Sequence, residues 1–219
     1  MLNTYIAQVQ DLLDDPNAQI WPTTSLTNYI NEARNRVAQE TKALRQIITT
    51  ETYSTMQFNV GQELYQYASW LPSPYNTALV DIMGVTVLVN DERYALKYWA
   101  YTQLNAYLRG WVNYQDWPIV FGRVGANQFY IAPVPNQTYP VEIDLAIIPN
   151  ALALDTDPEQ IPVPFQEPVQ YYAAYKAKLK IQAQGEAKYF LDLYDAILRR
   201  CAKGWMTRTI PNPYAVTPR

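Results

Sequence analysis

The sequence predicts an α+β protein, with a four-helix bundle formed by N- and C-terminal helical hairpins, an inserted antiparallel β-hairpin domain and an extended C-terminal arm. Three observations predict this class. Apolar residues recur at steps of three and four towards both ends of the chain, as in amphipathic helices. Between them the apolar period changes to two, as in strands with one buried face. Prolines at 211, 213 and 218 exclude a helix in the last residues.

Two helices joined by a short turn are predicted at the N-terminus. The first covers residues 3–14, and Pro16 ends it because the residue before a proline disfavours the α conformation. The second covers residues 23–45, with Thr24 or Ser25 as its N-cap. Its buried stripe consists of Leu26, Ile30, Ala33, Val37, Thr41 and Leu44. Together the two helices predict an antiparallel helical hairpin.

Three hairpins are predicted in the middle of the chain. Residues 47–58 and 63–68 form the first, around a turn that contains Gly61. Residues 80–89 and 93–101 form the second, around Asn90 and Asp91.

The third hairpin follows a short helix predicted over residues 102–110, which Gly110 ends. Residues 117–124 then lead into the stretch 127–148. There the alternating runs Phe129–Ile131 and Val141–Ile147 flank the turn "APVPNQTYP".

Two further helices are predicted near the C-terminus. Residues 165–184 form one, with Pro168 in its first turn and Gly185 as its end. Its buried face consists of Val169, Ala173, Ala177 and Ile181. Residues 186–205 form the other, whose predicted stripe consists of Phe190, Leu193, Ile197, Cys201 and Trp205.

A helical hairpin cannot bury its apolar stripe alone, so we expect the two hairpins to pack together. The predicted bundle covers residues 1–46 and 160–205. The inserted β-rich domain covers residues 47–159, and the extended arm covers residues 206–219.

The composition indicates a folded protein without a special stabilising group. The chain has 219 residues, of which 49% are hydrophobic and 17% charged, enough for a substantial core. Its single cysteine, Cys201, excludes an internal disulfide and favours a reducing compartment. No run approaches the roughly 18 apolar residues of a membrane span. We also expect no secretion signal, because no basic region precedes an apolar core near the N-terminus.

Residues suited to catalysis are scarce. The chain has no histidine, the commonest general base and metal ligand. Cys201 lies on a predicted apolar stripe, which favours a packed thiol over a nucleophile. Glu142 and Asp144 share one face of a strand, as a carboxylate pair would, but outward-facing polar alternation explains them more simply. We therefore expect no catalytic residue, cofactor or metal.

Aromatic content and charge distribution favour a protein of interfaces. There are 19 tyrosines and 6 tryptophans, residue types enriched where proteins meet. Residues 1–175 carry 8 basic and 17 acidic side chains, whereas residues 176–219 carry 9 basic and 3 acidic ones. Such polarity suits a subunit whose ends contact different partners or a neighbour in a ring.

The C-terminal arm has the composition of a docking segment. Prolines reduce the entropy that an extended arm loses on binding, and Ile210 and Tyr214 supply anchors. The predicted partner-binding residues are Arg208, Ile210, Pro211, Pro213, Tyr214, Val216 and Arg219. The alternative interpretation is an unstructured terminus.

The chain resembles the head-to-tail adaptor (connector) proteins of tailed bacteriophages. The resemblance rests on Trp117 to Phe121, Phe129 to Pro135, Tyr139 to Leu145 and the Tyr- and Ala-rich helix Gln166 to Lys178, together with an N-terminal helical pair that contains "LTNYINEARNRVAQET".

This resemblance implies a structural virion protein at the head-tail junction, made in the host cytoplasm. Its implied assembly is a ring of about twelve copies beneath the portal protein. The ring would extend the DNA channel and dock tail or nozzle proteins, with the C-terminal arm along the portal. DNA would pass without specific binding, because tight phosphate binding needs dense Lys and Arg contacts.

Two other functions stay open at this point. The first is a receptor- or carbohydrate-binding tail component, with Trp111 or Trp117 stacking on a sugar. The second is a glycosidase that uses Glu142 and Asp144 as its carboxylates.

Overall fold

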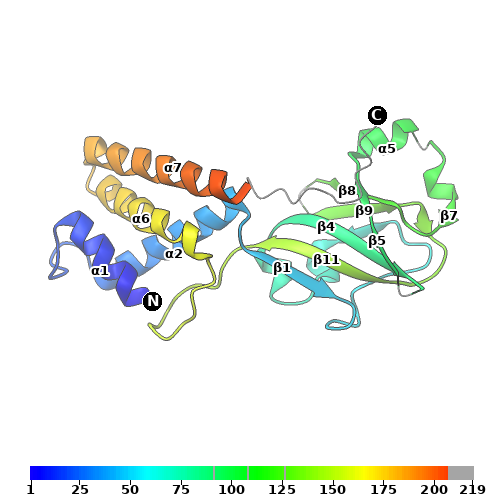
Figure 1. The fold of residues 1–219 in the computed structure, drawn as a ribbon, viewed down its shortest axis with the longest axis horizontal. Coiled ribbons are helices and arrows are strands. Elements are labelled where there is room, and N and C mark those ends of the chain that lie inside the picture. The colour runs from blue at the N-terminus through cyan, green and yellow to red at the C-terminus, as the bar shows by residue number, and fades with distance from the viewer. Residues whose placement is uncertain (91, 108, 126, 207–219) are drawn as a thin grey trace, which may run out of the picture. The chain divides into compact units, whose positions relative to one another are not determined.

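The computed structural model describes residues 1–206, apart from residues 91, 108 and 126. These residues form a mixed structure of seven α-helices and mainly antiparallel sheets, which confirms the predicted α+β class (Figure 1). The chain divides into two compact units. The helical unit consists of Met1–Ala43 and the described residues from Pro149 to Met206, and the β unit consists of Leu44–Ile148.

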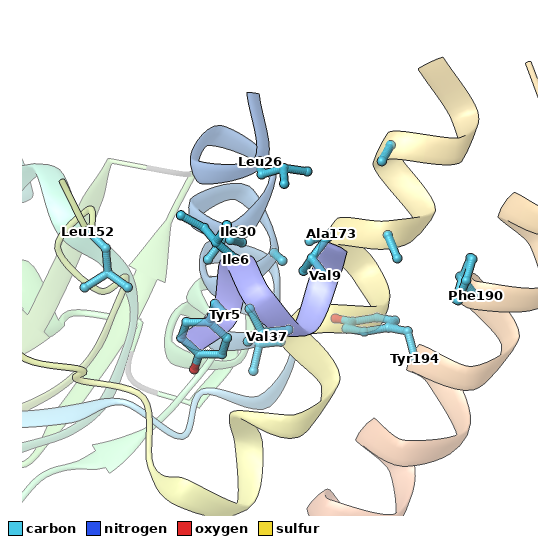
Figure 2. Close-up of a cluster of buried hydrophobic side chains, with 14 of the residues drawn as sticks. Tyr5, Ile6, Val9, Leu26, Ile30, Val37, Leu152, Ala173, Phe190 and Tyr194 are labelled. Carbon is cyan, nitrogen blue, oxygen red and sulfur yellow. The ribbon is translucent and has the colours of Figure 1, made fainter. Parts of the chain in front are cut away.

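The helical unit contains four long helices and one short 3-10 helix. They are α1 (Leu2–Leu13), α2 (Thr23–Thr41), η2 (Val163–Phe165), α6 (Glu167–Lys180) and α7 (Gln184–Met206). Helix α6 contacts each of the other three long helices. Buried side chains of these helices and of the segments that connect them form one hydrophobic cluster. Figure 2 shows part of it, namely Tyr5, Ile6, Val9, Leu26, Ile30, Val37, Leu152, Ala173, Phe190 and Tyr194.

Helix α2 differs from the prediction at both ends. It begins at Thr23 directly after Pro22 and has no side-chain cap, so the predicted cap at Thr24 or Ser25 is wrong. Instead, the Pro22 carbonyl accepts hydrogen bonds from the backbone N–H groups of residues 25 and 26. The helix ends at Thr41, because Lys42 is left-handed with φ 50°. Leu44 is therefore not helical, and its carbonyl accepts a sheet hydrogen bond from Ile147 instead.

The two C-terminal helices also shift from their predicted positions. Pro168 lies in the first turn of α6 as predicted, but α6 ends at Lys180 and Gly185 lies inside α7. Ile181, expected in the core, is 52% exposed. The buried stripe of α7 differs partly from the predicted one and consists of Ala187, Phe190, Tyr194 and Leu198. Leu193, Ile197 and Cys201 are only half-buried, and the side chain of Trp205 lies outside the described part.

A hydrogen bond explains why a tyrosine occupies the core face of α7. Tyr194 is 1% exposed, and its hydroxyl donates to Glu40 Oε2 at 2.9 Å. Burial and the charge of Glu40 both raise the pKa of this phenol.

Replacing Tyr194 by phenylalanine is expected to reduce the free energy of unfolding by about 1.5 kcal/mol, because a hydrogen bond to a charged group is lost. Urea unfolding measures this change. The matched control is Tyr189→Phe on the same helix, at a residue that is 61% exposed. An equal loss in both variants would contradict the proposed contribution of the Tyr194–Glu40 bond.

The β unit contains eleven strands, three short α-helices and one 3-10 helix. The strands are β1 (Arg45–Thr49), β2 (Gln57–Phe58), β3 (Leu64–Gln66), β4 (Leu79–Val89), β5 (Glu92–Ala95), β6 (Lys97–Tyr98), β7 (Gln115–Asp116), β8 (Val120–Val124), β9 (Gln128–Ala132), β10 (Val134–Pro135) and β11 (Tyr139–Ile147). The helices are α3 (Tyr67–Trp70), α4 (Tyr75–Ala78), α5 (Tyr101–Tyr107) and η1 (Trp111–Asn113).

Two larger sheets organise these strands. One has the order β1-β11-β4-β5, with β2 also paired to β11, and all its pairs are antiparallel. The other has the order β3-β9-β8-β6, in which β6 and β8 are parallel. Strands β7 and β10 form a separate parallel pair.

The hairpin predictions succeed in one case and fail in two. The second hairpin is confirmed, because β4 pairs with β5 around Asn90. The first is wrong, since β2 pairs with β11 whereas β3 pairs with β9. The third is also wrong, because β9 and β11 belong to different sheets. Alternation reveals which face of a strand is buried but not which strand lies beside it.

The short helix predicted over residues 102–110 is confirmed as α5, although it ends at Tyr107 rather than near Gly110.

Aromatic rings dominate the core of the β unit. Phe129 is fully buried and contacts the rings of Phe58, Tyr65, Tyr67 and Trp70, with ring centroids 5.0 to 6.2 Å apart. Part of the tyrosine content therefore serves the core rather than an interface.

Candidate assembly surfaces

The predicted docking arm lies outside the described residues. This applies to all seven predicted partner-binding residues, namely Arg208, Ile210, Pro211, Pro213, Tyr214, Val216 and Arg219. The structure does describe the last part of α7, from Arg200 to Met206, where the arm begins. We call this part of α7 the root of the arm.

The root of the arm is held against the beginning of α6. Arg200 of α7 donates to both carboxylate oxygens of Glu167, the nearer at 3.0 Å. Cys201 is half-buried beside this pair, and burial, followed by the charge of Glu167, raises the pKa of its thiol. A raised pKa disfavours the nucleophilic thiolate, which supports the interpretation of Cys201 as a packed thiol.

A pocket of about 260 Å³ lies between α1 and the beginning of α6. Tyr5 and Val163 contribute its apolar surface, while Gln8 and Gln170 contribute amides and Glu167 a carboxylate. We call it the α1–α6 pocket. Val163 is 77% exposed at its rim, whereas Tyr5 is buried.

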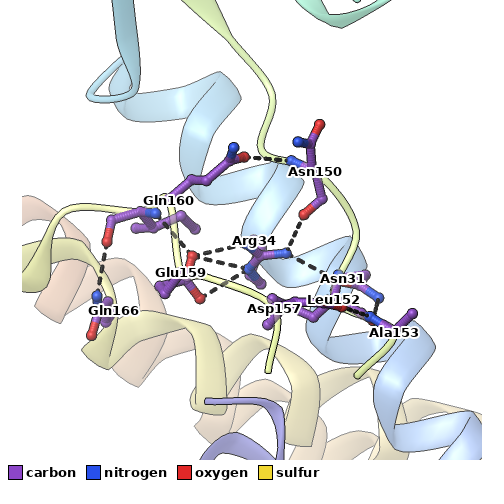
Figure 3. A network of polar contacts seen from close by, with 10 residues as sticks. Asn31, Arg34, Asn150, Leu152, Ala153, Asp157, Glu159, Gln160 and Gln166 are labelled. Atoms are coloured by element: carbon purple, nitrogen blue, oxygen red, sulfur yellow. Dashed lines mark hydrogen bonds and ion pairs between the residues drawn. The ribbon is translucent and has the colours of Figure 1, made fainter. Parts of the chain in front are cut away.

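The connector that precedes η2, residues 150–161, is held against helix α2 by a buried ion pair. The Arg34 side chain is 0% exposed, and its Nη2 lies 2.8 Å from Glu159 Oε1. Its Nε also donates to Glu159, and its Nη1 donates to the Asn150 carbonyl at 2.7 Å and to Asn31 Oδ1 (Figure 3). The Arg34 guanidinium group thus has hydrogen-bond partners on three sides, and these bonds offset the free-energy cost of removing its charge from water.

The same network holds the connector at several other points. Asn31 accepts from the Leu152 N–H and donates to its carbonyl. Asp157 accepts from the backbone N–H groups of residues 153 and 154, and these bonds lower the pKa of its carboxyl group (Figure 3). Residues 150–161 are therefore an ordered part of the helical unit although they contain no helix or strand.

The buried role of Arg34 was not predicted from the sequence. Arg34 lies four residues after Ile30, in the middle of the apolar stripe of α2. This position was the one signal in the sequence that indicated burial of Arg34. A charged residue on such a stripe needs a partner, but its partner Glu159 is 125 residues away and could not be identified from spacing.

An exposed aromatic segment occupies residues 98–119 of the β unit. Four of its tyrosines are exposed: Tyr98, Tyr101, Tyr107 and Tyr114. Arg109 and Asp116 are the charged residues of the segment. Exposed aromatic groups with few charges are typical of the central part of a protein interface.

The tryptophans considered for sugar binding are engaged elsewhere. Trp111 is 6% exposed, and its Nε1 donates to Asn105 Oδ1 at 3.0 Å. Trp117 is half-buried against Tyr94, with ring centroids 4.8 Å apart. The buried Trp111 therefore has no open face to stack on a sugar, and Trp117 is partly covered.

The carboxylates considered for a glycosidase are each engaged with an arginine. Glu142 accepts from Arg93, with the shortest distance 2.8 Å, and Asp144 accepts from Arg45. The Asp144–Arg45 pair joins the neighbouring strands β11 and β1, whereas the Glu142–Arg93 pair reaches from β11 across β4 to β5. The arrangement fits the outward polar alternation better than a catalytic pair.

The described part of the chain, residues 1–206 with three gaps, holds no group of three or more Cys, Asp or Glu residues arranged for a metal ion. None of the helices in it is long and apolar enough to span a bilayer.

Comparison with protein families gives a match over nearly the whole chain. The family model described as SU10 adaptor protein matches residues 2–216 of the chain. The chain belongs to the SU10 adaptor protein family. Comparison with curated proteins gives no match. The protein is thus a bacteriophage adaptor and a structural protein, as the resemblance noted in the sequence implied.

The family match extends through most of the adaptor's C-terminal arm. It ends at Val216 and so includes six of the seven predicted arm residues. It also spans both compact units, so the helical and β units are both parts of the adaptor family's fold.

Proposed function

We propose that this adaptor assembles into a ring of about twelve copies beneath the portal, extends the DNA channel and docks the tail. The observation that carries the proposal is the match of nearly the whole chain to a family of phage adaptors. The proposed location is the head-tail junction of the virion, after synthesis in the host cytoplasm. The proposed partners are further copies of the chain, the portal protein, and a tail or nozzle protein.

The two units are proposed to have separate tasks. In the helical unit, α1, α2, α6 and α7 would act as a four-helix bundle that positions the root of the arm. In the β unit, the exposed tyrosines of residues 98–119 suit a contact with a neighbouring copy or a tail protein, because aromatic, charge-poor surfaces are favoured at interfaces. The proposed division keeps the predicted bundle (residues 1–46 and 160–205), insertion (47–159) and arm (206–219), except that residues 149–159 go with the bundle, because they belong to the helical unit.

DNA is proposed to pass through the ring without specific binding. The net charge of the chain is −3, and its first 175 residues carry 8 basic against 17 acidic side chains. Affinity for DNA rises with the number of phosphates neutralised by Lys and Arg. An acidic chain of this kind favours passage over retention.

Truncation of the arm tests the proposed docking to the portal. A chain that ends at Met206 is expected to fold, since the described helices are complete, but not to join portal rings. Native mass spectrometry of each chain mixed with portal measures the number of copies bound. The matched control is the full chain with Ile20→Arg, a substitution at an exposed residue of the helical unit. Normal loading of the truncated chain would refute the docking role of the arm.

The same measurement addresses the alternative of a receptor- or carbohydrate-binding tail component. A free subunit that loads onto the portal in stoichiometric amounts supports the adaptor ring. A stable free trimer that ignores portal rings supports the alternative instead. The buried Trp111 and the packed Trp117 make the alternative the weaker candidate.

A further inference from the structure

The α1–α6 pocket has the size and chemistry of a site for side chains of a peptide. Its volume of about 260 Å³ is below the roughly 300–1,000 Å³ of pockets that hold drug-sized ligands. The apolar surface of Tyr5 and Val163 suits an aliphatic or aromatic anchor. The amides of Gln8 and Gln170 provide donors and acceptors for the backbone on either side of such an anchor.

The root of the C-terminal arm lies next to this pocket. Glu167 lines the pocket and also forms the ion pair with Arg200 of α7. Met206 follows Arg200 by six residues of helix, or about 9 Å at 1.5 Å per residue. An extended chain covers about 3.3 Å per residue, so four residues beyond the end of α7 reach at most about 13 Å and eight residues about 26 Å.

The charges at the pocket rim do not oppose the same contact. The arm carries Arg208 and Arg219 and no acidic side chain. Beside the pocket lie two exposed carboxylates: Glu167, and Asp155, which pairs with the N-terminal amino group of the pocket-lining Met1. Each carboxylate already has a cationic partner, so a basic arm gains at most a small, salt-dependent attraction at this rim.

We propose that in the free subunit the arm folds back on its own helical unit and places the segment Ile210–Tyr214 in the α1–α6 pocket. The occupant is the chain's own arm because a short tether gives an effective concentration in the millimolar range, which a second copy does not reach in dilute solution. The proposal rests on the proposed function, in which the portal is the final partner of the arm. Portal and pocket then compete for one segment, and the occupied pocket lowers the apparent affinity of the free subunit for the portal.

Limited trypsin digestion of the full chain tests the contact, with mass spectrometry of the released peptide 209–219. A docked arm protects the bond after Arg208, because cleavage follows the population of the free arm. Val163→Arg covers the pocket and repels the basic arm, and we expect it to raise the rate of this cleavage about tenfold. Ile20→Arg makes the same change of charge at an exposed residue that does not line the pocket, and should leave the rate unchanged.

A second variant separates loss of the pocket contact from loss of the fold. Gln8→Arg alters the opposite wall of the pocket at an exposed residue of α1 and is expected to raise the cleavage rate as Val163→Arg does. Helical circular dichroism identifies any variant that has lost its fold. Cleavage of the unchanged chain as fast as that of a free peptide of residues 207–219 would overturn the proposal. Protection that appears only when the measured mass doubles would also overturn it, by assigning the pocket to another copy's arm.

Portal loading separates this inference from the proposed function. If both hold, Val163→Arg exposes the arm and speeds loading, whereas the chain ending at Met206 does not load. If trypsin shows a free arm in the unchanged chain while truncation still abolishes loading, the pocket contact is wrong and the adaptor role stands. If Val163→Arg exposes the arm but truncation leaves loading intact, the portal role is wrong and the pocket contact stands.

Discussion

Replacing Arg34 by alanine is expected to reduce the free energy of unfolding of the helical unit by about 3–5 kcal/mol, the range for breaking a buried ion pair. The substitution leaves the Glu159 side chain, which is 4% exposed, without its charged partner, although the backbone N–H of Ile161 still donates to its carboxylate. It also removes the donor to the Asn150 carbonyl. Urea unfolding, followed by the helical circular dichroism signal, measures the loss.

An exposed ion pair provides the control for Arg34. Arg45 pairs with Asp144, but the Arg45 side chain is 47% exposed, so Arg45→Ala should cost no more than about 1 kcal/mol. The double variant Arg34→Met with Glu159→Leu should recover most of the lost stability, because apolar residues often replace a buried ion pair without cost. If Arg34→Ala and Arg45→Ala cost the same, the buried pair does not hold the connector as we infer.

Replacing Gly122 by alanine is expected to destabilise the β unit by about 3 kcal/mol, through overpacking and the loss of a buried hydrogen bond. The Tyr130 hydroxyl donates to the Trp99 carbonyl at 2.6 Å, and this bond lies directly over Gly122 in β8. A methyl group at residue 122 would collide with both oxygen atoms. The collision involves backbone and a buried ring, so neither side can move away cheaply.

Gly84 is the matched control for Gly122. It lies inside β4, and a methyl group there would meet no atom within 4 Å. Gly84→Ala should change the free energy of unfolding by no more than about 1 kcal/mol, with stabilisation the expected direction, because glycine weakens a strand interior. Thermal unfolding of both variants, followed by tryptophan fluorescence, makes the comparison. Equal effects at the two glycines would rule out close contact as the reason for Gly122.

Local patterns predicted the parts of this fold that depend on neighbouring residues. Helices α1, α2, α6 and α7 were all expected, because their apolar steps of three and four extend over three turns or more. The hairpin of β4 and β5 was also expected, since its turn at Asn90 lies between two strands adjacent in sequence. The absence of histidine predicted no catalytic site, and the resemblance to phage adaptors implied a role in assembly.

The failed predictions involve contacts between distant residues. Strand β1 pairs with β11 from Arg45↔Ala146 to Thr49↔Glu142, about 100 residues apart. Nothing in the sequence of either strand identifies the other as its partner. The same reason explains the missed role of Arg34, whose partner Glu159 lies on a connector without periodicity. On α7, the sequence indicated an apolar face, but packing against α6 selected Tyr194 and Leu198 over Leu193 and Ile197.

The sequence by itself therefore determined the α+β class, the four long helices and the adaptor family. Only the tertiary structure decided which strands pair, where helix α2 ends, and which charged side chain lies in the core. The physical reason is that periodicity records which face of an element is apolar, a property of a few adjacent turns or residues. The partner of that face is chosen by packing and hydrogen bonding over the whole chain, and these depend on residues that only folding brings together.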